Sequence, residues 1–226
     1  MKLLKKEPHE NVRQYAYRVL LYNITHLELL PGAVLSENEL SSAMGISRTP
    51  VREALIELSK MSLVDIIPQR GSYVTKIDYS LIEDARFIRL VIEKSIIREV
   101  SEKVTPKHLL LLELNIEEEK EALKNEDHEL FMELDNRFHE ILYSIAGRER
   151  VYSFIKPQLV HFDRLRALTI KTTPRDQTLE DHIQILKALK DKDLALATNS
   201  LEQHLTRHKE ERQELETMYP EFFITN

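Results

Sequence analysis

Apolar residues near the start of the chain recur every three or four positions, which is typical of one face of an amphipathic helix. These positions are Val12, Tyr15, Ala16, Val19, Leu20 and Ile24. Leu30-Pro31-Gly32 then interrupts the spacing with residues that favour a turn. The pattern predicts a first helix that ends before this turn.

The next segment has the signals of two short helices. Ser36 and Glu39 have the spacing of a capping box at the head of the first one. Gly45 offers the positive φ that ends such a helix, and Ser47 or Thr49 can cap another helix directly after it. Two short helices joined by a turn that contains glycine make a helix-turn-helix.

After residue 62 the apolar pattern changes from helical spacing to the pattern of a strand. Residues 63–67 and 72–75 each predict a strand, and Pro68-Gln69-Arg70-Gly71 between them predicts a turn. A hairpin directly behind a helix-turn-helix makes a winged helix. The sequence therefore predicts a winged helix-turn-helix domain over residues 1–76.

Basic residues stand at the two places where a winged helix meets DNA. Arg48, Thr49 and Arg52 open the third helix, and the N-terminal residues of a recognition helix reach base edges in the major groove. A bidentate contact between arginine and guanine contributes about 1–3 kcal/mol of discrimination. Arg70, at the hairpin tip, can enter the minor groove or meet a phosphate. Each arginine alone could be solvated surface charge, but their joint placement favours DNA binding.

The remaining two thirds of the chain show no strand alternation and no internal repeat. Helix breaks lie near Thr105-Pro106, Asn125-Glu126-Asp127, Gly147, Thr172-Thr173-Pro174 and Asp191-Lys192-Asp193. These breaks predict five to seven helices in an all-α domain. We interpret the acidic runs Glu117-Glu118-Glu119 and Glu210-Glu211 as solvated helix faces without a chemical role.

Charge and composition narrow the function. The 226 residues carry a formal net charge of -6, which by itself weighs against nucleic acid as a ligand. Residues 1–76, however, hold 10 Lys and Arg against 8 Asp and Glu, and DNA binding depends on the local field at the contact surface. Cysteine is absent, so any metal must be held without thiolates. Apolar runs are too short to span a bilayer, and we expect a cytoplasmic protein that does not bind membranes.

Several histidines of the helical domain are predicted to point inward. Asp135 and His139, four residues apart beside an apolar stripe, can coordinate one metal ion from a single helix. His182 and His204 follow the apolar spacing of two later helices, and His208, one turn beyond His204, competes with it. One buried histidine is more often a core residue than a ligand, but this combination favours a metal site. Zinc is our first choice, with nickel, manganese and iron left open.

Two motifs of the first domain point to a known family. The run Ser-Arg-Thr-Pro-Val-Arg-Glu-Ala-Leu occupies residues 47–55, and Arg-Gly-Ser-Tyr-Val occupies residues 70–74. With them, residues 35–74 resemble the DNA-binding domain of GntR-type bacterial transcription regulators. The resemblance implies operator contacts from Ser47, Arg48, Thr49, Arg52, Arg70 and Gly71. Ser47 would bond a phosphate, and the last two residues would form the wing contact.

Further motifs extend this resemblance to the helical domain. They are Arg89-Leu90-Val91-Ile92-Glu93, Asp135-Asn136-Arg137-Phe138-His139, Asp181-His182-Ile183-Gln184-Ile185-Leu186 and His204-Leu205. Residues from about 80 to 215 thus resemble the effector-binding FCD domain of the FadR branch of the family. In metal-containing members such positions bind the ion, which implies four ligands here: Asp135, His139, His182 and His204.

The resemblance also implies a small organic-acid effector whose carboxylate completes the metal coordination and pairs with an arginine. Arg89 is the first candidate because its motif places it on the first helix of the domain, and a surface ion pair with Glu93 is the alternative. Arg164 and Arg166 are further candidates. Arg148 stands where many relatives carry Asn, and whether it reaches the pocket stays open.

Together these features predict a mainly α protein with a winged helix-turn-helix at residues 1–76 and a helical domain for metal, effector and dimerisation at residues 77–226. We expect a homodimeric repressor that reads a palindromic operator in double-stranded DNA, because one helix-turn-helix offers too little contact area. Two alternatives remain: a metal-dependent enzyme, and an architectural DNA-binding dimer. No His-Glu-x-x-His or Gly-x-Ser-x-Gly motif is present, which weighs against the enzyme.

Overall fold

The structure is a computed structural model that describes residues 1–169 and 176–224, without the side chains of residues 208–211. The helix break predicted at Thr172-Thr173-Pro174 lies outside these described residues. Within them, none of the helices combines the length and the apolar character that a bilayer span requires.

Contacts divide the chain into two compact units. The first contains Met1–Tyr79, Asp163–Leu168 and Gln213–Asn226, and the second contains Ser80–Phe162 and Thr169–Arg212. The C-terminal segment joins the first unit through backbone hydrogen bonds: the Ile77 N–H donates to Phe222 O at 2.7 Å, and the Ile224 N–H donates to Ile77 O at 3.1 Å. The units therefore do not follow a single cut in the chain.

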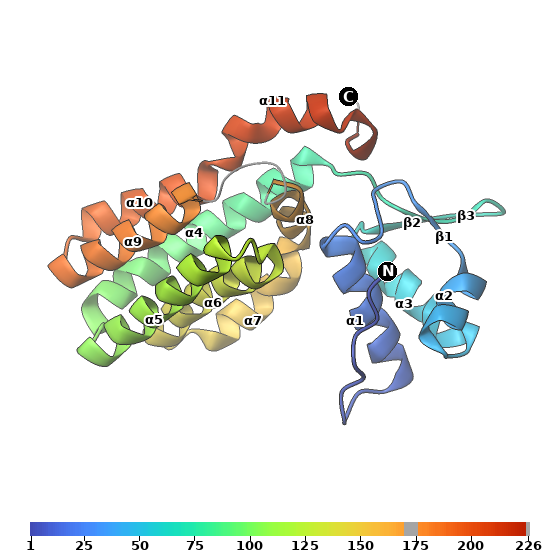
Figure 1. Cartoon of the computed structure of the whole chain (residues 1–226), viewed down its shortest axis with the longest axis horizontal. Coiled ribbons are helices and arrows are strands. Elements are labelled where there is room, and N and C mark those ends of the chain that lie inside the picture. The colour runs from blue at the N-terminus through green and yellow to red at the C-terminus, as the bar shows by residue number, and fades with distance from the viewer. Residues whose placement is uncertain (170–175, 225–226) are drawn as a thin grey trace. The chain divides into compact units, whose positions relative to one another are not determined.

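Three helices and a small sheet build the N-terminal part of the first unit (Figure 1). The helices are α1 (Val12–Thr25), α2 (Glu37–Met44) and α3 (Arg48–Lys60). α1 packs against α3, and its buried apolar residues are Tyr15, Ala16, Val19, Leu20 and Ile24. Each fully buried aliphatic side chain contributes about 1.5–3 kcal/mol, so this predicted apolar face holds α3 in place.

Local signals set the ends of α2 and α3. Ser36 caps α2 by accepting a hydrogen bond from the Glu39 N–H at 3.3 Å. Gly45 follows α2 with a φ of 64°, in the left-handed region where glycine has no steric penalty. Ser47, rather than Thr49, is the N-cap of α3. The helix-turn-helix predicted from these signals is confirmed.

The predicted hairpin is present as β2 (Val64–Ile67) and β3 (Gly71–Val74), which pair antiparallel with Ile67 opposite Gly71. A short strand that the sequence did not predict, β1 (Val34–Leu35), pairs with the other edge of β3 and gives the order β1-β3-β2. Two residues are too few to show alternation, so β1 depends on the hydrogen-bonding groups that β3 offers. The winged helix is confirmed.

From Tyr79 onward the described part of the chain is helical (Figure 1). It forms α4 (Tyr79–Lys103), α5 (Pro106–Lys124), α6 (His128–Ala146), α7 (Glu149–Ile155), α8 (Val160–Thr169), α9 (Asp176–Asp191), α10 (Leu194–Thr206) and α11 (His208–Met218), with 3-10 turns at Lys156–Leu159 and Pro220–Phe222. The described residues thus exceed the predicted five to seven helices. One reason is Pro157, which lacks the N–H that a continuous α7–α8 helix would need, so a 3-10 turn separates the two.

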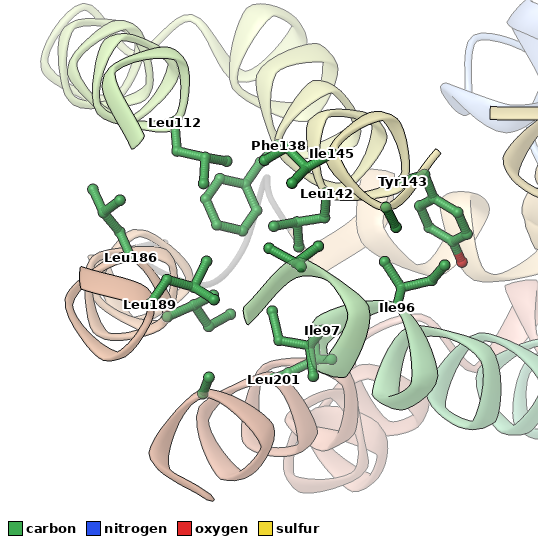
Figure 2. Close-up of a cluster of buried hydrophobic side chains, with 14 of the residues drawn as sticks. Ile96, Ile97, Leu112, Phe138, Leu142, Tyr143, Ile145, Leu186, Leu189 and Leu201 are labelled. Carbon is green, nitrogen blue, oxygen red and sulfur yellow. The ribbon is translucent and has the colours of Figure 1, made fainter. Parts of the chain in front are cut away.

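A hydrophobic core joins the helices of the second unit. Figure 2 shows Ile97 of α4, Leu112 of α5, Phe138 of α6, Leu186 of α9 and Leu201 of α10 gathered in it. Within this unit α9 packs against α10, and α5 packs against both α6 and α9. The core therefore fixes the relative positions of the helices that carry the predicted metal ligands.

Candidate functional site

The N-terminal end of α3 presents the predicted DNA-contacting side chains to solvent. Arg48, Thr49 and Arg52 are all exposed. The opposite face of α3 is buried through Val51, Ala54, Leu55 and Leu58. Because this apolar face anchors the helix, the arginines lie on the side that a major groove can receive.

Two neighbours extend this polar surface. Ser47 is exposed, and its side chain makes no capping hydrogen bond although it is the N-cap of α3. A helix N-terminus of this kind has N–H groups directed at an incoming phosphate. Glu37, in the first turn of α2, places its Oε2 atom 3.3 Å from Arg48 Nη2, a pair that the sequence analysis missed.

The wing tip is a tight turn that exposes Arg70 and Gly71. Gly71 has a φ of 115°, which only glycine adopts without strain. The Tyr73 hydroxyl donates to Arg70 O at 3.0 Å, and the Arg70 N–H donates to Ile67 O at 3.0 Å. The backbone that carries Arg70 is therefore held from both sides, while its side chain stays in solvent.

In the second unit the structure brings the four predicted metal ligands together. Asp135 and His139 lie on α6, His182 on α9 and His204 on α10. One ligand atom from each lies within 4.8 Å of the others. His139 Nε2 is 3.1 Å from His204 Nε2, and Asp135 Oδ1 is 3.8 Å from Nε2 of both His182 and His204. Asp135, His139 and His182 are buried and His204 is nearly so.

Carboxylates face the other ring nitrogen of these histidines. Glu119 Oε2 is 2.8 Å from His182 Nδ1, and Glu93 Oε2 is 2.7 Å from His139 Nδ1. A carboxylate at Nδ1 favours the tautomer whose proton is on Nδ1, which leaves the lone pair on Nε2. The lone pairs therefore point at the common centre of the cluster.

Burial and charge act differently on the three histidines. Burial lowers the pKa of His139 well below its ordinary value, and the charge of Arg89 lowers it further. Burial also lowers the pKa of His204. Burial opposes a charge on His182 as well, but the carboxylates of Glu119, Asp135 and Asp181 raise its pKa above the ordinary value.

The cluster fits a divalent metal ion. His182 Nε2 is buried and has no hydrogen-bond partner among the described residues. His139 Nε2 and His204 Nε2 are 3.1 Å apart, so one ring can donate an N–H to the other, and if both protons are on Nδ1 the two lone pairs repel each other unless a cation lies between them. Imidazole nitrogens and a carboxylate oxygen are ligands that zinc, nickel, manganese and iron accept. The donor set thus fits the predicted group without selecting one metal.

The effector arginine candidates lie in different places. Arg89 is buried, and its Nε–H donates to Glu93 Oε1 at 2.8 Å, so the Glu93 pair expected at the surface lies in the core. Arg164 belongs to the first unit, where it donates to Thr75 O at 2.6 Å and to Thr75 Oγ1 at 3.1 Å. Arg166, also in the first unit, lies 3.1 Å from Asp163 Oδ1.

Two positions that the sequence left open can be placed in part. Arg148 is exposed and donates to Glu99 Oε1 through Nε and Nη2, at 3.1 and 3.0 Å. The His208 side chain lies outside the described residues, although its backbone begins α11.

The interpretation of the first acidic run as solvated is wrong for Glu119, which is completely buried. Glu118, its neighbour, is half-exposed and pairs with Arg137. The signal was in the spacing, since Glu119 continues the buried positions Leu112 and Ile116 at helical intervals. Because a buried carboxylate is costly unless it is paired, a carboxylate on an apolar helix face indicates a polar or charged partner in the core.

A winged helix-turn-helix with exposed arginines, followed by a helical unit with a buried histidine cluster, is the architecture of a DNA-binding regulator. Sequence comparison agrees. Residues 13–74 match the family described as bacterial regulatory proteins of the gntR family, and residues 84–207 match the FCD domain.

Relatives cover most of the chain. The HTH-type transcriptional repressor RspR of Escherichia coli K12 is 35% identical over 199 residues, 88% of this chain and 87% of the relative. A transcriptional regulator from an unstable DNA locus of Streptomyces ambofaciens is 33% identical over 215 residues, 95% of this chain and 90% of the relative. The structure of E. coli McbR/YncC shares the fold, with a TM-score of 0.73, 21% identity and coverage of 88% and 95%.

The chain therefore belongs to the GntR family of bacterial transcription regulators and carries an FCD domain. The resemblance drawn from its motifs is confirmed. Its relatives are transcription regulators rather than enzymes, so the enzyme alternative is not supported.

We predict that Arg164 stabilises the first unit more than Arg166 does. Arg164 is buried, which lowers its pKa to about 10, and it satisfies the carbonyl of Thr75. Arg164→Ala leaves that carbonyl without a donor and is expected to cost about 1–3 kcal/mol of unfolding free energy in urea. Arg166→Ala, whose pair with Asp163 is partly exposed, is expected to cost about 0–1 kcal/mol. Equal losses would contradict the assignment.

Proposed function

We propose that the protein is a homodimeric repressor whose binding to a palindromic operator is controlled by a metal ion and a small carboxylate. The convergence of Asp135, His139, His182 and His204 in one buried cluster carries this proposal. An architectural dimer needs no such cluster, because apolar residues would serve its core better. The E. coli relative RspR is a transcriptional repressor, which supports repression as the mode of regulation.

On the DNA side, Arg48, Thr49 and Arg52 contact base edges from the major groove, and Ser47 bonds a phosphate at the start of α3. Arg70 and Gly71 supply the wing contact. Exposure of all these residues on one winged helix supports the assignment. A bidentate arginine selects guanine, so Arg48 and Arg52 set most of the specificity.

Two copies of the chain are needed, because one recognition helix covers only a half-site. The helical unit offers an apolar surface for the second copy. On α4 the side chains of Phe87 and Val91, one turn apart, are 62% and 54% exposed. Side chains of this kind on one helix face favour association.

In the helical unit the four ligands would hold a divalent ion, with zinc as the first choice, and the ion would supply positive charge that attracts a carboxylate. Arg89 completes the effector site, because it pairs with Glu93, whose other carboxylate oxygen lies 2.7 Å from His139 Nδ1. Arg164 and Arg166 belong to the first unit, whereas Arg89 lies in the second unit with the cluster, so Arg89 is the preferred candidate.

The ligand acts as a switch only if it binds the DNA-bound and the DNA-free arrangement with different affinity. Release of DNA on effector binding is the outcome that the family resemblance implies.

Arg52→Ala is expected to weaken specific operator binding by about 10- to 100-fold, from the loss of a bidentate base contact worth about 1–3 kcal/mol. The operator is first selected from genomic fragments, and affinity is then measured by gel shift. Lys60→Ala removes the same charge from the other, C-terminal end of α3 and is expected to change little. Undiminished operator affinity in Arg52→Ala would contradict the recognition-helix assignment.

His182→Ala is expected to abolish tight metal binding, because it removes one of the four proposed ligands. The His182 ring is buried and stacks on Phe138 at a ring-centroid distance of 3.9 Å. Elemental analysis of the purified protein and a zinc titration of the stripped protein measure the effect. His128→Ala, an exposed histidine at the start of α6, is the control and keeps its metal. Equal metal content in both variants would move the site elsewhere.

Arg89→Gln is expected to weaken carboxylate binding by about tenfold or more, since a hydrogen bond to a charged group contributes about 1.5–3 kcal/mol. The glutamine can still donate to Glu93. Calorimetric titration of the metal-loaded protein with a series of small mono- and dicarboxylates gives the affinities. Arg148→Gln, which alters an exposed arginine, serves as the control. The same carboxylate affinity in both variants would exclude Arg89 from the site.

A further inference from the structure

Three buried carboxylates surround the metal cluster without belonging to its ligand set. They are Glu93, Glu119 and Asp181, with 2%, 0% and 7% of their surface exposed. Burial of a carboxylate is costly unless the group is paired and hydrogen-bonded. The interaction partners of each carboxylate therefore indicate its role.

Each carboxylate faces the Nδ1 atom of a different histidine. The separations from Nδ1 are 2.7 Å for Glu93 and His139, 2.8 Å for Glu119 and His182, and 3.6 Å for Asp181 and His204. Glu119 is hydrogen-bonded to His182, whereas the Glu93–His139 and Asp181–His204 contacts are ion-pair distances without hydrogen-bond geometry. Metal-binding histidines in proteins characteristically have such a carboxylate, which fixes the ring and its tautomer.

Cationic side chains hold two of these carboxylates in turn. Arg89 Nε donates to Glu93 Oε1 at 2.8 Å. Arg207 Nη2 donates to both oxygens of Asp181, at 2.7 and 2.8 Å. A carboxylate whose position is fixed by an arginine can in turn orient the histidine that it contacts.

Glu119 differs because it has no lysine or arginine partner among the described residues. Asn115 Nδ2 donates to Glu119 Oε1 at 2.7 Å and also to Leu134 O at 3.0 Å. The neutral amide orients the carboxylate but leaves its charge uncompensated. The remaining partner of Glu119 is His182, so positive charge on this imidazole or at the centre of the cluster beyond it offsets the carboxylate.

We propose that Glu119 is a positioning residue that holds His182 with its proton on Nδ1, that Glu93 and Asp181 support His139 and His204 by charge, and that the three carboxylates thereby set the affinity for the metal. The inference rests on the proposed metal site. It adds α4 and α5 to the helices that the ion connects, because Glu93 lies on α4 and Glu119 on α5. The ligands alone come from α6, α9 and α10.

Glu119→Gln tests the proposal most directly. A glutamine amide can donate to Nδ1 and so stabilise the wrong tautomer of His182, with its proton directed at the metal. We expect zinc affinity about 10–100-fold weaker than in the wild type, measured on metal-stripped protein by competition with a chromophoric chelator. Glu118→Gln, the exposed neighbour on α5, is the matched control and is expected to bind zinc as the wild type does.

A second measurement separates positioning from a purely structural role. The metal-free Glu119→Gln protein is expected to unfold at the wild-type temperature or above, because the substitution removes a buried charge. Its cobalt-loaded form is expected to show altered visible absorption, since the ligand field reports the orientation of His182. Wild-type zinc affinity, or an unaltered cobalt spectrum, in Glu119→Gln would overturn the proposal.

The wild-type titration distinguishes this inference from the proposed function. A wild-type protein without measurable zinc affinity refutes the metal site itself. Tight binding in the wild type with equal affinity in Glu119→Gln refutes only the positioning role. If Glu119→Gln does not fold, Glu119→Asp provides the same zinc measurement, because its shortened carboxylate keeps the charge but withdraws the oxygen from His182 Nδ1.

Discussion

The second unit depends on the compensation of charge buried at one place in its core. Asp135, Glu93, Glu119 and Asp181 are all buried carboxylates, and Arg89 and Arg207 supply two opposing charges. Imidazole lone pairs meet at the same point. An apolar core such as that of Figure 2 would be more stable without these groups, so their presence supports the proposal that this part of the bundle is a binding site.

The groups that hold the outer carboxylates lie on helices through which the chain passes between the units. Arg89 is on α4, whose first residue, Tyr79, ends the first unit's N-terminal segment. Arg207 lies between α10 and α11, and the chain re-enters the first unit at Gln213. The cationic partners of two outer carboxylates are thus close in sequence to two of the four points where the chain passes between the units.

Local physical signals made much of the chain predictable. A glycine with positive φ, a serine N-cap and period-specific apolar spacing specify the helix-turn-helix and hairpin with little help from distant residues. Gly45 and Ser36 behave as their sequence context required. The same spacing placed Asp135, His139, His182 and His204 on inner helix faces, because the helical period alone decides which side chains turn to the core.

The sequence by itself therefore determined the family, the helix faces and the ligand types. Only the tertiary structure decided which groups meet. Glu119 is buried and hydrogen-bonded to His182, although the acidic run that contains it was expected to be solvated. Arg164 donates to Thr75 O, and β1 pairs with the edge of β3. These outcomes depend on contacts between residues that are far apart in the chain. Whether a charged side chain is buried or solvated depends on which residue it pairs with in the folded protein, and the local sequence does not contain that information.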